Sequence, residues 1–107
     1  MDLKEQLKIY DEIVDKAELV RKGKTMFYTS DNGYMFSQLN KAGEIGIRLS
    51  KEDTIDFDSK YKAQAFKSYG AIMKDYVLIP QDLLEDIKVV VLYLKKGHEY
   101  VMSLPPK

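Results

Sequence analysis

The side chains of this sequence that could recognise another molecule are few and lie in short stretches. Arg48 follows alternating apolar and polar residues, and its guanidinium could hold an acidic group or a backbone carbonyl of a partner. Lys24 precedes an aromatic stretch, while Lys74, Asp75 and Tyr76 are consecutive. Basic side chains can bind acidic surfaces, and tyrosine rings can stack on bases. We therefore predict these five residues as candidate binding residues.

Each candidate also has a purely structural interpretation. Arg48 could form a salt bridge with Glu44 or with an acidic residue of a neighbouring strand. Lys74 and Asp75 could be charges that protect the edge of a strand against pairing with other chains. Tyrosines such as Tyr76 pack most often in the core or at its rim.

Residues typical of catalysis or metal binding do not form a recognisable set. His98 is the only histidine, and we expect it to pack at the rim of the core because no partner residues surround it. Four acidic residues follow one another closely: Glu52, Asp53, Asp56 and Asp58. They suit the first turns of a helix, and they lack the spacing and the central glycine of a calcium loop. There is no phosphate-binding glycine loop and no GxSxG motif. We expect no catalytic residue, no metal site and no cofactor.

Composition predicts a soluble globular protein. The 107 residues suffice for a single domain, residues 1–107, with one core. Lys+Arg and Asp+Glu both number 17, so the basic excess of a general nucleic-acid binder is missing. The absence of cysteine excludes disulfides and zinc–thiolate sites and fits a reducing compartment. The charged N-terminus and short apolar runs indicate neither a secretory signal nor a membrane span. We expect a cytoplasmic protein without membrane contact.

Hydrophobic spacing predicts the elements that position these side chains. Apolar residues recur every three or four positions near both ends and alternate with polar residues between them. The predicted order is helix 2–22, strands 24–29, 33–39 and 44–49, helix 51–60, two strands within 64–79 and helix 81–103. Tight turns at Asn32-Gly33 and near Gly43 make the first three strands an antiparallel meander. We predict a second hairpin turn near Tyr69-Gly70 and close packing at Gly46 in mid-strand. This order predicts an α+β fold, a two-layer sandwich of one antiparallel sheet and its helices.

The stretch from Met73 to Leu84 joins the last predicted strand to the last predicted helix at Pro80, whose ring fits a first helical turn. Further along, the helix is apolar all round from Val89 to Leu94. In a two-layer protein such a helix has only one sheet face to bury, and the excess indicates a second chain. We therefore predict self-association through Val89, Leu92 and Tyr93, with a homodimer as the simplest assembly.

Several of these segments, taken in order, resemble the TfoX N-terminal-domain family of bacterial proteins. They are Lys24-Thr25-Met26-Phe27, Asn32-Gly33-Tyr34-Met35-Phe36, Ile47-Arg48-Leu49, Phe66, Met73-Lys74-Asp75-Tyr76-Val77, Pro80, Leu83-Leu84 and Ser103-Leu104-Pro105-Pro106-Lys107. The resemblance implies an α+β fold and a domain without established catalytic activity or cofactor. Two-domain relatives regulate natural competence and carry a helical C-terminal domain, which we do not expect in this chain.

Three classes of function follow from these observations. The first is a small non-enzymatic regulatory module that binds another protein. The second is a nucleic-acid-associated regulator of transcription or competence, which rests on analogy with the two-domain relatives. The third is an enzyme that uses carboxylates and tyrosine, which no spacing in the sequence supports.

Overall fold

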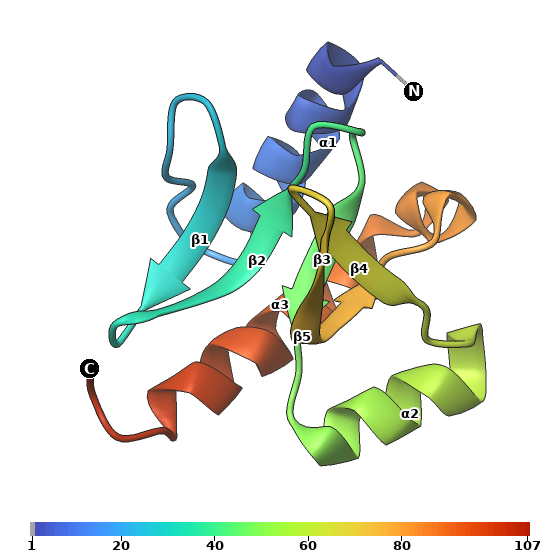
Figure 1. Ribbon diagram of the computed structural model, residues 1–107. Helices are drawn as coiled ribbons and strands as arrows, with labels where there is room; N and C mark the ends of the chain where they lie inside the picture. The colour runs from blue at the N-terminus through green and yellow to red at the C-terminus, as the bar shows by residue number, and fades with distance from the viewer. Residues whose placement is uncertain (1) are drawn as a thin grey trace.

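The computed structural model describes residues 2–107 and shows a five-stranded antiparallel sheet packed against helices (Figure 1). The helices are α1 (Leu3–Lys16), α2 (Lys51–Tyr61) and α3 (Ile87–Met102), and the 3-10 helix η1 (Gln81–Glu85) precedes α3. The strands are β1 (Phe27–Asp31), β2 (Tyr34–Leu39), β3 (Ile45–Arg48), β4 (Ala65–Ser68) and β5 (Ala71–Leu78). The α+β class and the predicted order of the main elements are confirmed.

The strands lie in the order β1-β2-β3-β5-β4, and every neighbouring pair is antiparallel. The chain leaves β3 through α2 and returns through β4, so that β5 pairs with β3. Two-residue turns close both tight hairpins, with positive φ at Asn32 and Gly33 in one and at Tyr69 and Gly70 in the other. These two predicted hairpin turns are confirmed. The predicted turn near Gly43 is confirmed as well, since Gly43 has φ of 81° and its amide donates to the carbonyl of Asn40 at 3.0 Å between β2 and β3.

The first helix is shorter than predicted, because α1 ends at Lys16 and not near residue 22. Glu18 adopts a left-handed conformation with φ of 60°, and the amide of Leu19 donates to the carbonyl of Val14 at 3.1 Å. Glu18 thus ends the helix in the left-handed conformation that glycine usually takes at this position. Val20, which lies within the predicted helix 2–22, is outside α1 and 74% exposed.

The predicted helix 81–103 is also wrong in its first part. The chain forms η1, breaks at Asp86, and begins α3 at Ile87. The buried face of α3 includes Val90, Leu94 and Gly97. A Cβ atom on Gly97 would lie 2.6 Å from the carbonyl oxygen of Arg48. Glycine thus lets the helix backbone approach the sheet closely.

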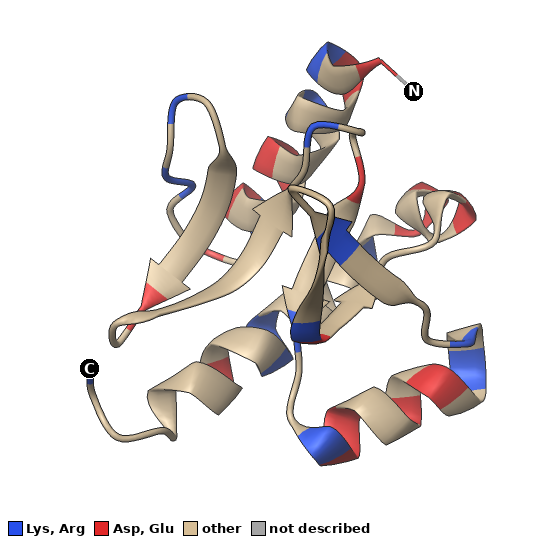
Figure 2. Cartoon of the chain, viewed as in Figure 1, with Lys and Arg blue, Asp and Glu red and all other residues tan. Residues whose placement is uncertain are grey.

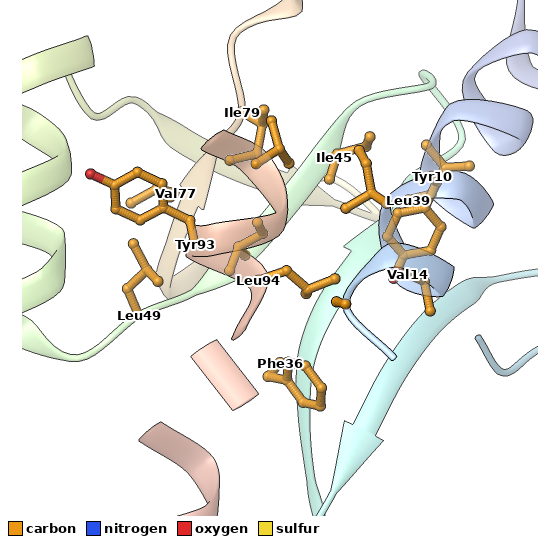
Figure 3. Packing of buried hydrophobic residues seen from close by; sticks show 14 of the residues in the cluster. Tyr10, Val14, Phe36, Leu39, Ile45, Leu49, Val77, Ile79, Tyr93 and Leu94 are labelled. Atoms are coloured by element: carbon orange, nitrogen blue, oxygen red, sulfur yellow. The ribbon is translucent and has the colours of Figure 1, made fainter. Parts of the chain in front are cut away.

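The main core fills the space between the sheet and the helices (Figure 3). Tyr10 of α1, Ile45 of β3 and Leu94 of α3 are each at most 2% exposed. The hydroxyl of Tyr10 lies 2.6 Å from Ser37 Oγ, which lies 2.5 Å from Thr29 Oγ1. These buried hydroxyls satisfy one another and tie α1 to β1 and β2. Burial raises the pKa of Tyr10 above its usual range.

The opposite face of the sheet is covered by a strand of the same sheet, β4, which curls over β3. Phe66 of β4 is fully buried, and its ring packs on Gly46, where a Cβ atom would lie 2.4 Å from the ring. Close packing at Gly46 is therefore confirmed. Asn40 Nδ2 donates to the carbonyl of Lys67 at 2.8 Å and holds β4 over the end of β2. The sheet is curled, and the β4–β5 hairpin lies on the side away from α1 and α3 (Figure 1).

We expect Gly46→Ala to lower the free energy of unfolding by about 1–3 kcal/mol, because the new methyl group overlaps the Phe66 ring. Urea unfolding measures this change. In a Phe66→Leu background the smaller side chain can move aside, so the cost of Gly46→Ala should fall. If the losses in free energy of unfolding caused by Gly46→Ala and Phe66→Leu simply add in the double variant, the Phe66 ring does not clash with the new methyl group.

Candidate functional site

Arg48 and Tyr76, two predicted binding residues, lie side by side, because they are paired across β3 and β5. The guanidinium carbon of Arg48 lies 5.6 Å from the ring centre of Tyr34 and 5.5 Å from that of Tyr100. The hydroxyl of Tyr76 donates to the carbonyl of Met35 at 2.8 Å. Cation–π attraction and a strand-to-strand hydrogen bond thus connect β2, β3, β5 and α3 here.

The alternative interpretation of Arg48, a salt bridge with Glu44, is not what the structure shows. Glu44 Oε1 accepts a hydrogen bond from Asn40 at 3.0 Å, and the Arg48 guanidinium faces aromatic rings. Arg48 Nε is buried without a hydrogen-bond partner among the described residues. Burial raises the pKa of Tyr76, and the positive charge of Arg48 opposes that rise. We infer that this pair stabilises the fold.

Lys74 and Asp75 are exposed on β5 next to Tyr76. Asp75 has φ of 69°, and its carbonyl accepts from the amide of Leu49 at 3.1 Å, so β5 bends there. The structure therefore brings four of the five predicted residues together. Lys24 is separate from them, on the exposed loop that leads into the edge strand β1.

The predicted self-association surface is wrong for Tyr93, which is 2% exposed. The α2 helix covers it: the ring of Phe57 lies 5.0 Å away, edge-on, and the Tyr93 hydroxyl donates to Asp56 Oδ2 at 2.7 Å. The sheet is thus not the only surface against which α3 packs. Leu92 is 52% exposed and Val89 is half-buried, and self-association through these two stays a prediction.

His98 lies at the rim of the core, as its isolation in the sequence predicts. Its Nε2 atom lies 2.8 Å from Asp31 Oδ2, and its ring centre lies 5.3 Å from that of Phe36. The hydrogen bond with His98, followed by one from the amide of Asn32, lowers the pKa of Asp31. This contact joins the β1–β2 turn to α3.

We expect the Asp31–His98 contact to make stability fall at low pH. A carboxyl whose pKa is lower in the folded state contributes stability above its unfolded pKa of 3.8, and this contribution is lost as the pH falls through the folded value. Urea unfolding from pH 5 to pH 2.5 should show Asp31→Asn losing less stability than the parent chain. Asp82→Asn, at an exposed residue of η1, should follow the parent. Parallel curves for all three proteins would contradict the assignment.

A groove of about 250 Å³ lies between the β1–β2 region and the tip of the β4–β5 hairpin. Its apolar lining includes Leu3, Met26, Phe27 and Leu39 from one side, and Tyr69 from the hairpin. We call this hollow the Tyr69 groove. Leu3 is the first residue of α1, so the groove lies where the start of this helix, β2 and the β4–β5 hairpin tip come together.

Gln38 lines the Tyr69 groove and is 1% exposed. Its Nε2 atom donates to Ser68 Oγ at 2.7 Å, which fastens the hairpin to β2. Its Oε1 atom has no hydrogen-bond partner among the described residues. A buried acceptor without a partner is uncommon in native proteins, since it loses water without compensation.

Tyr69 stands at the rim with φ of 53°, and it is 70% exposed. A bulky residue rarely adopts this left-handed conformation, and such strain is concentrated at functional sites. The ammonium of Lys41 lies 5.4 Å from the Tyr69 ring centre. Lys24 precedes the groove residue Thr25 in the chain but does not itself line the groove. Neither lysine has an ion-pair partner in the part of the chain that the structure describes.

Sequence reasoning did not find Gln38, Lys41 or Tyr69. One signal was present: Tyr69 precedes Gly70 in a two-residue turn, where Asn or Asp is the usual residue. The other hairpin of this chain has Asn32 at the same position. A strained aromatic residue in place of asparagine indicates a side chain that has a role other than stabilising the turn.

We expect Tyr69→Asn to raise the free energy of unfolding by roughly 0.5–1 kcal/mol, because asparagine tolerates the left-handed conformation better. Urea unfolding with the parent chain as reference measures the gain. Tyr69→Phe keeps both the ring and the strain, so its stability should match that of the parent. A Tyr69→Asn protein that is no more stable than the parent would show that position 69 is unstrained.

Positive side chains do not form one continuous face in the view of Figure 2, where Lys and Arg positions alternate with Asp and Glu over the helices and loops. Lys22 is hydrogen-bonded to a neighbouring strand residue, since its Nζ atom donates to Ser30 Oγ at 2.9 Å.

Among residues 2–107 no three His, Asp or Glu side chains come together as a potential metal site. Within the same residues, no helix is long and apolar enough to cross a membrane.

Neither known protein-family models nor curated protein sequences give a match to this chain.

Proposed function

We propose that this chain is a non-enzymatic module with a regulatory role, and that it binds a partner protein through the Tyr69 groove. The observation that carries the proposal is a concave apolar surface with an exposed, strained tyrosine at its rim. A strained exposed side chain lowers stability without improving the core, so it is retained where binding uses it.

The other polar clusters support this proposal because their groups already bind one another. Tyr10 bonds Ser37, and His98 bonds Asp31. Arg48 contacts two tyrosine rings. These contacts explain the clusters as fold-stabilising. Among the described residues both Gln38 Oε1 and Arg48 Nε lack a hydrogen-bond partner, and of these two residues Gln38 is the one that lines the apolar Tyr69 groove.

The regulatory part of the proposal rests on the resemblance to the TfoX N-terminal-domain family. Its quoted segments fall on all five strands, on η1 and on the tail after α3, and they include Met26 and Phe27 of the groove. Relatives with two domains act as regulators, and a module of this kind acts by binding other molecules. The groove supplies a surface for such binding.

Site-specific photocrosslinking in the cells that make this protein tests the proposal. With p-benzoylphenylalanine at position 69, we expect irradiation to give one discrete adduct with another protein, identified by mass spectrometry. The same reporter at position 55 is the control, since Ile55 of α2 is 65% exposed and lies outside the groove.

An adduct that forms equally from positions 69 and 55 would contradict binding at the groove, and so would the absence of any adduct. An adduct with a second copy of the chain would show self-association in place of partner binding. Thermal unfolding of both reporter proteins verifies that each is folded.

A further inference from the structure

We infer that the Tyr69 groove accepts an aromatic side chain with a hydrogen-bond donor, tryptophan or tyrosine, from an acidic segment of the partner protein. This inference rests on the proposed function and names the chemistry that the groove recognises. Three properties of the groove carry it: its size and apolar lining, the unpartnered amide oxygen of Gln38, and the positive charge of its rim.

Size restricts the occupant to about one large side chain. The groove encloses about 250 Å³, whereas sites for drug-sized ligands span roughly 300–1,000 Å³. Met26, Phe27 and Tyr69 present apolar surface to it. Thioether and aromatic surfaces favour an aromatic ring as their neighbour. Aromatic residues are also the usual anchors of protein interfaces.

The Gln38 amide selects an occupant with a donor. Its Oε1 atom lacks a partner, while Nε2 is already engaged by Ser68 at 2.7 Å. An indole N–H or a phenol O–H at the tip of the ring would supply the missing bond. An aliphatic side chain would leave the oxygen unpaired.

Charge at the rim selects an acidic neighbourhood for that residue. Lys41 lines the groove and is exposed. None of the groove-lining residues is Asp or Glu. A segment with carboxylates beside its aromatic residue is therefore attracted by Lys41, and a basic segment is repelled.

Indole-3-acetate is a probe that combines the ring, the donor and the carboxylate. In amide chemical-shift titrations of the whole chain, we expect it to bind with a Kd of about 1 mM. The shifts should centre on Met26, Gln38 and Tyr69. Indole-3-acetate methylated on the ring nitrogen lacks the donor and should bind roughly tenfold more weakly. Tryptamine, with an amine in place of the carboxylate, should bind about fivefold more weakly.

Variants locate the two polar contacts. Gln38→Met keeps the length of the side chain and removes the acceptor, so it should abolish the difference between the probe and its N-methyl form. Lys41→Glu should weaken indole-3-acetate about fivefold, while Lys95→Glu, an equal charge change on α3, should stay within about twofold. The amide spectra verify that each variant is folded.

Equal binding of the probe and its N-methyl form, tighter binding of tryptamine, or shifts centred elsewhere would overturn the inference. The two proposals fail separately. A crosslinked partner at position 69 without probe binding would leave the proposed function standing and reject the aromatic–acidic occupant. Probe binding at the groove without a crosslinked partner would leave the ligand chemistry standing and reject the proposed function.

Discussion

The Phe66 ring packs on the backbone of Gly46, and this contact allows one five-stranded sheet to bury side chains on both faces. Helices α1 and α3 cover one face, as in other two-layer folds. No helix is needed over the centre of the other, because β4 curls across it. A side chain at position 46 would hold the hairpin away. The hydrogen bond from Gln38 to Ser68 depends on this close approach of Phe66 to Gly46, and so does the Tyr69 groove.

The α2 helix has a comparable role on the helical side. It lies between β3 and β4 in the chain and presents Phe57 and Asp56 to Tyr93. An apolar helix in a small protein needs more than one covering surface. Here that second surface comes from the same chain, which explains why Tyr93 is buried without another molecule.

The fold was predictable from local signals where those signals were strong. Asn32-Gly33 specifies a tight turn, and Ser50 caps α2 by accepting a bond from the amide of Asp53 at 3.1 Å. The early end of α1 at Glu18 was not predictable, because a non-glycine residue takes the left-handed conformation. The strand order was not predictable either, since pairing of β5 with β3 depends on packing between distant segments.

The candidate site residues could likewise be predicted only where residue type alone was informative. Arg48 and Tyr76 could be selected by residue type, but their partners, the rings of Tyr34 and Tyr100, come from segments far apart in the sequence. The importance of Gln38 is likewise a property of the fold, because an amide without a partner exists only once its surroundings are complete.

The two tight hairpins of this chain show how the Tyr69 groove differs from the rest of the molecule. Both turns require positive φ at their first residue. At Asn32 the side chain fits that conformation, and its Nδ2 atom donates to the carbonyls of Val101 and Leu104, each at 2.9 Å. At position 69 the residue is strained and exposed, and the ammonium of Lys41 lies 5.4 Å from its ring centre. Stability alone would favour asparagine in both turns. The tyrosine therefore points to selection for contact with another molecule. The fold tolerates the strain because two contacts fix the β4–β5 hairpin: the Phe66 ring packs on Gly46, and Gln38 donates a hydrogen bond to Ser68.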